Sequence, residues 1–398
     1  MRTRLLWLVC LWAGTAAPVA QTPAAPPPAS FDLAAIEGPR ILPAADRMLA
    51  DAPVTVTAAH SPRSAGGLHD FFSEGDYWWP DPQNPDGPYI QRDGMTNPDN
   101  FVAHRQAMIR FSIRVGTMTS AYALTRDERY ARAAVSHLRA WFVDPETRMT
   151  PHLLYAQAIK GRATGRGTGI IDTIHLVEVA RAVPILAQSK ALRDDDRAAI
   201  VRWFADYLAW LTTHKYGIDE RDTKNNHATC WVMQVAAFAQ VTGNQAVLDD
   251  CRRRYTTILL PDQMAADGSF PLELARTKPY GYSIFNLDAF AGICQILSTP
   301  ADNLWAFTLP DGRGMARGVA YLFPFLKDKS AWTRTKDVMY FDQWPVRQPS
   351  LLFAGLAFHE PRYLELWRSL DGSPTVEEVL RNLPIRHPLL WVPSSRAR

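Results

Sequence analysis

Two short stretches of the chain hold side chains whose types and spacing suit acid–base chemistry on a sugar acid. The first contains Asn225, Asn226 and His227, and the second contains Arg276 and Tyr282. β-Elimination from a uronic acid needs donors that neutralise the sugar carboxylate, a base for the adjacent C5 proton and an acid for the departing O4. Asn, His, Arg and Tyr side chains supply these functions without a metal ion.

The chemistry of each side chain suggests a role for it. Asn226 and His227 are predicted to neutralise the carboxylate, and Tyr282 is predicted to transfer protons. Because an unperturbed tyrosine has a pKa of about 10, Arg276 is expected to favour its ionised form. His227 is either a carboxylate ligand, when one tyrosine acts as both base and acid (syn), or the base on the opposite face of the sugar (anti). The sequence leaves both arrangements open, and Tyr280 is a second candidate tyrosine.

Both stretches are predicted to lie where a loop meets a helix. Asn225 or Asn226 can serve as the N-cap of the helix that follows, and Asn225 is also a candidate for contact with the substrate. Pro279 and Gly281 are expected to hold the two neighbouring tyrosines in a loop until Ser283 caps the next helix. Loops of this kind are common positions for catalytic groups.

A long loop from His69 to Asn100 is rich in turn formers and aromatic residues. Loops of this length in a compact protein are usually functional or disordered, and the aromatic content argues against disorder. Trp78 and Trp79 are predicted either to stack against sugar rings or to pin the loop onto the helices. Arg92 in the same loop is a further candidate for binding an acidic sugar.

The glycine-rich stretch Gly161–Gly169 has two interpretations. It lacks the Gly-Lys-Ser/Thr ending and the preceding strand of a phosphate-binding loop, which argues against a nucleotide site. Its glycines permit close approach of a ligand, and Arg162 and Arg166 are candidates for binding carboxylates of a polyuronate. The alternative is a solvent-exposed loop that leads into a helix at Ile170.

The rest of the chain indicates an all-α protein with a single α/α toroid, an incomplete ring of helix hairpins whose long loops line a cleft. Apolar residues recur at helical spacing, and no convincing alternating strand pattern occurs between the helices. The predicted helices are Ile41–Leu49, Phe101–Leu124, Glu128–Phe142, Ile170–Gln188, Asp194–His214, His227–Thr242, Gln245–Leu259, Ser283–Leu297, Leu304–Thr308 continuing into Gly312–Leu326, Ser350–Phe358 and Pro361–Ser369.

The N-terminal residues indicate export. Arg2 and Arg4 precede an apolar run from Leu5 to Trp12 and then small residues, the pattern of a secretory signal peptide over residues 1–20. The run is shorter than the ~20 residues that span a bilayer, so no membrane insertion is expected after cleavage. Residues 21–35 are predicted to be a Pro/Ala-rich linker and residues 36–398 the toroid domain, in a secreted or periplasmic protein.

Composition limits the partners and cofactors. The hydrophobic share of 47% and charged share of 21% are typical of a globular protein, and a net charge of +3 does not favour nucleic-acid binding. Of the four cysteines, Cys10 lies in the predicted signal peptide. The other three, Cys230, Cys251 and Cys294, are an odd number without metal-type spacing, which argues against a disulfide framework. We therefore expect no metal and no cofactor.

The order of motifs resembles that of the alginate lyase superfamily, polysaccharide lyases with an α/α toroid and an Asn-Asn-His motif. The motifs are Ser73–Pro80, Gly165–Thr173, Asn225–His227 and Arg276 ahead of Tyr282. In that family the matching Asn and His contact the carboxylate or take part in proton transfer, the Arg assists, and the Tyr is the acid or both acid and base. The resemblance extends over about residues 68–358 and implies these roles for the matching residues here.

The resemblance implies a secreted enzyme that cuts an acidic polysaccharide, alginate or glucuronan, by β-elimination. One departure concerns the residues after Asn-Asn-His, which are Ala228–Trp231 here and Ser-Tyr-Trp in the best-known alginate lyases. The choice among mannuronate, guluronate and glucuronate therefore stays open.

Two other functions fit the same fold. A glycoside hydrolase would need two carboxyl groups about 5–5.5 Å or about 6.5–9.5 Å apart, for which Asp76, Asp267 and Glu273 are candidates. A non-catalytic polyuronate-binding protein would need neither arrangement. Only elimination makes an unsaturated, ultraviolet-absorbing uronate, so that product separates the three functions.

Overall fold

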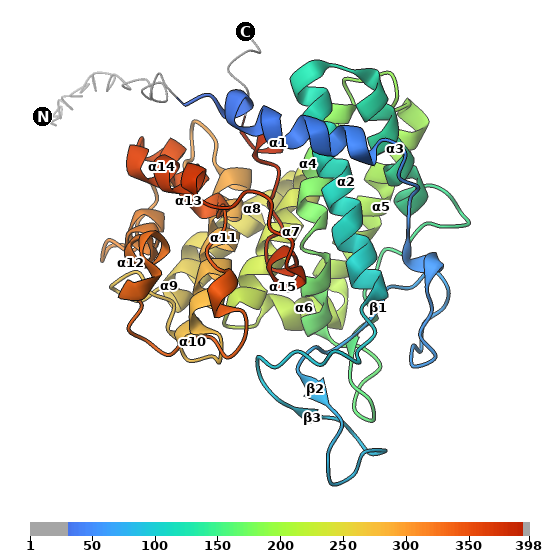
Figure 1. Ribbon diagram of the computed structural model, residues 1–398, viewed down its shortest axis with the longest axis horizontal. Coiled ribbons are helices and arrows are strands. Elements are labelled where there is room, and N and C mark those ends of the chain that lie inside the picture. Colours follow the sequence, from blue (N-terminus) through green and yellow to red (C-terminus); the bar gives the residue numbers. More distant parts are fainter. Residues whose placement is uncertain (1–30, 393–398) are drawn as a thin grey trace, which may run out of the picture.

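The computed structural model of the protein describes residues 31–392, so the predicted signal peptide and most of the predicted linker lie outside the described residues. Helices make up the body, and short strands occur in loops at one end of it (Figure 1). The helices are α1 (Leu33–Met48), α2 (Ala103–Thr125), α3 (Glu128–Phe142), α4 (Leu176–Leu186), α5 (Asp194–Thr213), α6 (Lys215–Arg221), α7 (Asn226–Thr242), α8 (Gln245–Arg254), α9 (Leu260–Gln263), α10 (Pro271–Leu274), α11 (Pro279–Leu297), α12 (Met315–Lys327), α13 (Pro349–Ala357), α14 (Pro361–Ser369) and α15 (Glu377–Arg381).

The helices form two rows. In the inner row α2 packs against α4, α4 against α7, α7 against α11, and α11 against α13. In the outer row each helix packs on a member of the inner row: α3 on α2, α5 and α8 on α7, α12 on α11, and α14 on α13. This arrangement is an open α/α toroid, so the fold class predicted from the sequence is confirmed.

Burial patterns explain which helices are inner and which are outer. In α7 every residue from Ala228 to Ala239 is buried, as expected for a helix with neighbours on all sides. In the outer helix α3, buried residues such as Tyr130, Ala134, Leu138 and Trp141 recur at intervals of three or four and form one face. A helix that is apolar on all sides therefore belongs to the inner row, and a helix with one apolar face belongs to the outer row.

The first helix is longer than predicted. α1 begins at Leu33 rather than at Ile41, so residues 33–35 belong to it and the predicted linker is wrong there. Asp32 caps the helix, because its Oδ1 accepts a backbone N–H at 3.0 Å. Two internal prolines, Pro39 and Pro43, lie on the exposed face while Ile41 is buried.

Three other predicted helices differ from the structure. The predicted Ile170–Gln188 helix consists of a 3₁₀ segment, Gly167–Thr173, followed by the shorter α4. The predicted helix from Gln245 is interrupted by a π-helical turn at Tyr255–Leu259. Leu304–Thr308 does not form a helix and consists mainly of turns. Five residues are too few to make a helix stable by themselves.

The start of α11 corrects the prediction that the two tyrosines lie in a loop. α11 begins at Pro279 rather than Ser283, because proline at the first helical position loses no intrahelical hydrogen bond. Asp337 from a distant loop accepts the N–H groups of Tyr280 and Gly281 at 2.8 and 2.9 Å. This carboxylate caps the helix end, which local sequence alone does not reveal.

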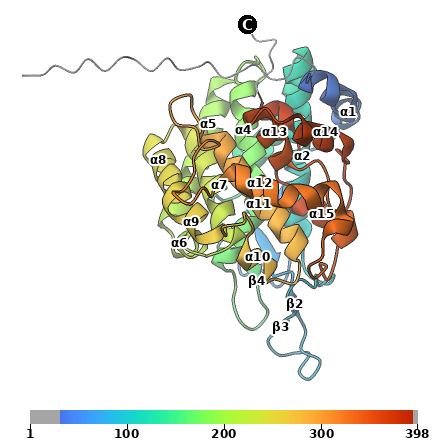
Figure 2. The same cartoon turned by 90° about the vertical axis from the view of Figure 1, so that its left-hand side faces the viewer.

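Short strands connect the long loops at one end of the toroid. β1 (Phe72–Glu74) pairs in parallel with β4 (Tyr155–Ala158), and β2 (Trp78–Trp79) pairs antiparallel with β3 (Ile90–Gln91). Figure 2 shows β2 and β3 extending beyond the ends of the helices. The strands were not predicted because two to four residues are too few to show an alternating pattern.

Two further findings concern the whole described chain. Cys230, Cys251 and Cys294 are all buried and unpaired. Among residues 31–392, no helix combines the length and the apolar character needed to cross a membrane.

Candidate active site

One cavity at the loop-bearing end of the toroid brings together the four predicted catalytic residues. Asn226, His227, Arg276 and Tyr282 all line it, although the two pairs come from different helix ends. Asn226 and His227 begin α7, whereas Arg276 precedes α11 and Tyr282 lies in its first turns. The packing of α7 against α11 places these two helix starts side by side.

His227 is oriented by a carboxylate that lies seven residues earlier in the chain. Its Nδ1 is 2.6 Å from Oε1 of Glu220 in α6, and the Glu220 side chain is only 1% exposed. A buried carboxylate accepts the Nδ1 proton and so leaves Nε2 as the nitrogen available to a substrate. This pairing is suited to a base with a fixed tautomer.

Asn226 is held by another buried carboxylate. Its backbone N–H and its Nδ2 donate to the two oxygens of Glu273, each at 2.7 Å. Burial raises the pKa of Glu273 despite these hydrogen bonds. The interaction fixes the Asn226 amide and leaves its second Nδ2 hydrogen for a ligand.

The Tyr282 hydroxyl is paired with a second tyrosine. Its Oη lies 2.5 Å from Oη of Tyr77, which lies in the short turn between β1 and β2 within the long loop. Burial raises the pKa of Tyr282 well above its ordinary value, the Tyr77 hydroxyl raises it further, and Arg276 acts in the opposite direction. Tyr282 is therefore kept protonated in this site. Arg276 does favour the ionised tyrosine, as expected, but its effect on the pKa of Tyr282 is smaller than that of burial.

Arg276 stacks on the tyrosine that it was predicted to tune. Its Cζ lies 4.6 Å from the centroid of the Tyr282 ring, and its Nη2 forms an ion pair with Oδ1 of Asp93 at 2.7 Å. Burial would lower the pKa of Arg276, but Asp93 and Tyr282 raise it above its ordinary value. Asp93 thus compensates the guanidinium charge and holds it over the ring.

Two of the predicted substrate-binding residues, Trp78 and Arg166, also line the cavity. Arg166 donates from Nε to the backbone oxygen of Gln157 and from Nη2 to its side-chain oxygen, both at 2.9 Å. Within the described residues it forms no ion pair with a carboxylate. Burial lowers its pKa, while the charges of Asp172, Glu220 and Asp76 act in the opposite direction. The guanidinium beside the cavity is thus held by Gln157 rather than by a direct ion pair.

The other predicted contacts lie outside the cavity. Trp79 donates from Nε1 to the backbone oxygen of Met95 at 2.8 Å, and Arg92 stacks over its ring at 5.1 Å. Arg162 donates to the backbone oxygen of Tyr89 at 2.7 Å. Trp79 therefore ties two parts of the long loop to each other rather than to the helices, and of the two tryptophans only Trp78 lines the cavity.

Two predicted binding residues have structural roles. Tyr280 is fully buried, and its hydroxyl donates to the backbone oxygen of Phe325 at 3.0 Å. Its ring packs against Trp332, so the prediction that Tyr280 meets the substrate is wrong. Asn225 is the N-cap of α7, because its Oδ1 accepts the His227 N–H at 3.4 Å.

Comparison with known proteins identifies the family. The family model described as alginate lyase matches residues 55–332. The chain belongs to the alginate lyase family. It is therefore a polysaccharide lyase, and the resemblance derived from its motifs is confirmed. No curated protein matches the chain at a significant level.

Solved structures agree with this family. An alginate lyase from Bacteroides ovatus has 32% sequence identity and a TM-score of 0.78, over 90% of this chain and 93% of that one. Alginate lyase A1-III from a Sphingomonas species has 14% identity and a TM-score of 0.52, over 88% of this chain and 94% of that one. A variant of A1-III in complex with a tetrasaccharide has 13% identity and a TM-score of 0.54 over 88% and 93%. The two A1-III structures share the fold with this family member.

The carboxylates considered for hydrolysis do not form a free pair in this lyase. Asp76 is ion-paired with Arg105 at 2.8 Å, and Glu273 is bonded to Asn226. Asp267 accepts a backbone N–H within its own turn and does not line the cavity. Among residues 31–392, no group of three or more His, Cys, Asp or Glu side chains is placed to hold a metal ion.

Several residues that line the cavity or contact its lining were not predicted. Glu220 and Asp93 became visible only through their contacts with His227 and Arg276, because acidic residues at such spacings are common on protein surfaces. Tyr77 lies within the loop motif that carries the resemblance, and its neighbouring tryptophans drew attention instead. Arg381 and Asn382 also line the cavity, and no sequence signal connects them to the other residues.

Proposed function

We propose that the protein is a secreted lyase that cleaves a polyuronate by β-elimination, with alginate as the first candidate substrate and glucuronan as the second. The observation that carries the proposal is the single cavity that holds Asn226, His227, Arg276 and Tyr282 in a member of this family. The related structures named alginate lyases, one of them bound to a tetrasaccharide, support an acidic polysaccharide as substrate. Export rests on the signal-peptide pattern of residues 1–20.

The substrate carboxylate is neutralised by Asn226 and Arg166. Asn226 offers its second amide hydrogen, because Glu273 occupies the first. Arg166 offers a guanidinium without a carboxylate partner among the described residues. A uronate carboxylate held in this way withdraws charge from C5 and makes its proton easier to remove. Trp78 provides a flat face for a neighbouring sugar ring.

The two proton transfers use two different residues that line the cavity. His227 takes the C5 proton at Nε2, while Glu220 stabilises the imidazolium that forms. The bond between C4 and the glycosidic oxygen breaks as the C4–C5 double bond forms, and Tyr282 gives its proton to the departing oxygen. Arg276, stacked on the ring, stabilises the phenolate left behind. Solvent exchange then returns His227 and Tyr282 to their starting protonation states.

A second arrangement is favoured by the short contact between Tyr77 and Tyr282. In it Tyr282 first releases its own proton to solvent through Tyr77, takes the C5 proton as the phenolate, and then gives that proton to the departing oxygen. His227 would then bind the carboxylate. The two arrangements require different substrates, because the C5 proton and O4 lie on opposite faces in guluronate but on the same face in mannuronate and glucuronate.

Product analysis tests the function and separates the arrangements. Purified protein is incubated with polymannuronate, polyguluronate and glucuronan, and ultraviolet absorbance reports unsaturated uronates. Absorbance from polyguluronate supports His227 as base, whereas absorbance from polymannuronate or glucuronan alone supports the second arrangement. New reducing ends without absorbance would indicate hydrolysis, and binding without either product would indicate a non-catalytic protein.

His227→Asn provides an independent test of the base. Asparagine can still donate a hydrogen bond but cannot accept the C5 proton, so we expect kcat to fall about 10³-fold if His227 is the base. A loss of about tenfold or less would assign His227 to carboxylate binding. N-terminal sequencing of the exported protein tests secretion, and retention of residues 1–20 would contradict it.

A further inference from the structure

The C-terminal segment Glu377–Asn382, which comprises α15 and the next residue, reaches the catalytic cavity. Arg381 and Asn382 line this cavity beside Tyr77 and Tyr282. Both lie beyond residue 332, where the match to the family model ends. The cavity is therefore completed by a part of the chain that the family motifs do not include.

Arg381 is connected to the catalytic loop through Asp76. The guanidinium forms an ion pair with Asp76 and lies 3.3 Å from Oε2 of Glu378, while 14% of the side chain stays exposed. Arg105 of α2 binds the other oxygen of Asp76 at 2.8 Å. Asp76 immediately precedes Tyr77, so these two arginines fix the backbone from which the Tyr77 hydroxyl extends toward Tyr282.

Glu378 provides a second connection to the tyrosine pair. Its Oε1 accepts a hydrogen bond from Nζ of Lys278 at 2.8 Å in a nearly fully buried ion pair. The same Nζ lies 5.2 Å from the centroid of the Tyr77 ring, and Lys278 is the residue directly before α11. The segment thus contacts both elements that carry the paired hydroxyls.

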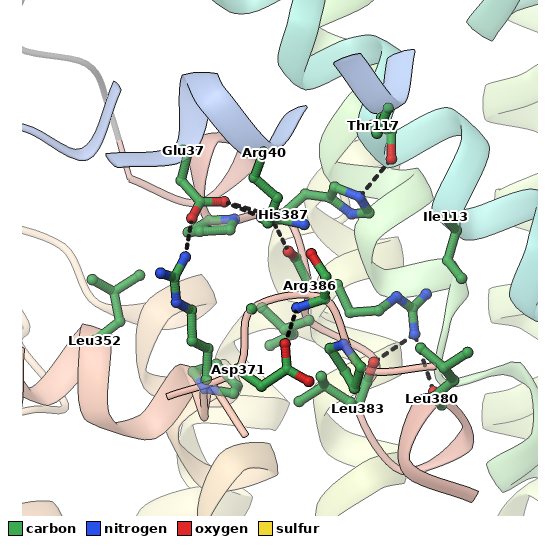
Figure 3. Close-up of a pocket in the computed structure, with 18 of the residues that line it drawn as sticks. Glu37, Arg40, Ile113, Thr117, Leu352, Asp371, Leu380, Leu383, Arg386 and His387 are labelled. Carbon is green, nitrogen blue, oxygen red and sulfur yellow. Dashed lines mark hydrogen bonds and ion pairs between the residues drawn. The ribbon is translucent and has the colours of Figure 1, made fainter. Parts of the chain in front are cut away.

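The segment is itself anchored to the body of the toroid (Figure 3). Arg386 donates to the backbone oxygens of Leu380 and Leu383, which closes the chain after α15. His387 is 2.9 Å from Oγ1 of Thr117 in α2 and 2.7 Å from Glu178 in α4. These buried contacts allow α15 to act as a rigid wall rather than as a loose tail.

Asn382 presents an unused acceptor. Its Nδ2 donates to the backbone oxygen of Glu378 at 2.8 Å, whereas its Oδ1 accepts no hydrogen bond from the described residues. The side chain is half-buried and lines the cavity. A neutral acceptor suits a sugar hydroxyl, since a carboxylate at this place would repel a polyuronate.

We propose that the segment Glu377–Asn382 is a substrate-recognition and positioning element of the lyase. Asn382 accepts a hydrogen bond from a hydroxyl of the bound sugar, and Arg381 is a positioning residue that holds Tyr77 through Asp76. This inference rests on the proposed function and adds the part of the chain that completes the site.

Substitution of Asn382 tests the sugar contact. Asn382→Asp keeps the shape and adds a negative charge, so we expect KM to rise about tenfold with little change in kcat. Asn382→Ala should raise KM by about threefold. Asn244→Asp is the matched control, because Asn244 is exposed at the start of α8 and does not line the cavity. An unchanged KM in both Asn382 variants would overturn the contact.

Substitution of Arg381 tests positioning. Arg381→Gln should lower kcat about tenfold and change KM less, because Tyr77 loses its fixed place beside Tyr282. Arg381→Lys should restore part of kcat, and the exposed Arg368→Gln serves as control. A folded Arg381→Gln protein that keeps the wild-type kcat, with or without a loss of thermal stability, would show that Arg381 does not position Tyr77 for the reaction.

The wild-type assay separates this inference from the function itself. Absence of an unsaturated product from the wild type on every polyuronate would reject the proposed function. A wild type that makes the product, with variants that keep its kcat and KM, would reject only the inference. If Arg381→Gln does not fold, the Asn382 variants still decide whether the segment meets the substrate, because they leave the ion pairs intact.

Discussion

The two walls of the catalytic cavity are built in different ways. The histidine side, defined as Glu220, Asn225, Asn226 and His227, comes from one short stretch, residues 220–227, which ends α6 and begins α7. The tyrosine side comes from segments far apart in the chain: Tyr77, Asp93, Arg276, Tyr282 and Arg381. One wall therefore depends on local helix geometry, and the other depends on how the long loop, α11 and α15 meet.

This difference corresponds to a difference in electrostatics. On the histidine side a buried carboxylate, Glu220, lies 2.6 Å from Nδ1 of the imidazole and orients the ring. On the tyrosine side burial and the neighbouring hydroxyl raise the pKa of Tyr282, which keeps its hydroxyl protonated. The comparison teaches that the two groups proposed as base and acid have different environments.

The largest effect is expected for Tyr282→Phe, which removes the transferable proton of the tyrosine side. We expect kcat to fall about 10³-fold while oligouronate binding, measured by calorimetry, stays close to that of the wild type. The ring still packs under Arg276, so the fold is retained. Turnover near the wild-type level would assign the acid role to another group.

The next effect is expected for Glu220→Gln on the histidine side. The amide can donate to Nδ1 and so favour the wrong tautomer of His227, which should lower kcat about 10²-fold with little change in KM. Asp219→Asn is the matched control, because Asp219 lies beside Glu220 in α6 but is exposed. Equal kcat values for the two variants would show that Glu220 does not support the base.

A smaller effect is expected for Tyr77→Phe. Tyr77 raises the pKa of Tyr282, and an acid works only while it is protonated, so activity is lost as pH rises through that pKa. Without Tyr77 the pKa of Tyr282 falls, and the alkaline limb of the kcat profile should move to lower pH, with kcat about tenfold lower at neutral pH. An alkaline limb that stays in place would contradict this coupling.

The smallest effect is expected for Asn225→Ala, which removes the N-cap of α7. Unfolding in urea should show a loss of about 1 kcal/mol in stability, while kcat changes little because Asn226 and His227 are held by Glu273 and Glu220. Asn225→Ser should keep most of the stability, since serine also caps helices. A large loss of kcat without loss of stability would instead indicate contact between Asn225 and the substrate.

Much of the helical framework was predictable from the sequence. Strong periodicity located α2, α3, α5 and α7 to within a few residues, because apolar spacing reflects which faces a long helix buries. Prediction failed where distant groups decide the conformation. α11 starts early because Asp337 from another loop caps it, and the short strands depend on pairing between loops.

The catalytic site shows the same division. Residue types and order alone predicted that Asn226, His227, Arg276 and Tyr282 lie in one site, because elimination requires those groups and the motifs occur in the family order, and all four line one cavity. Only the tertiary structure decided which groups orient and tune them: Glu220 for the histidine, and Tyr77 with Asp93 for the tyrosine side. Only the tertiary structure brought α15 to the cavity. The physical reason is that hydrogen bonds and burial act over a few ångströms in space, whatever the separation along the chain.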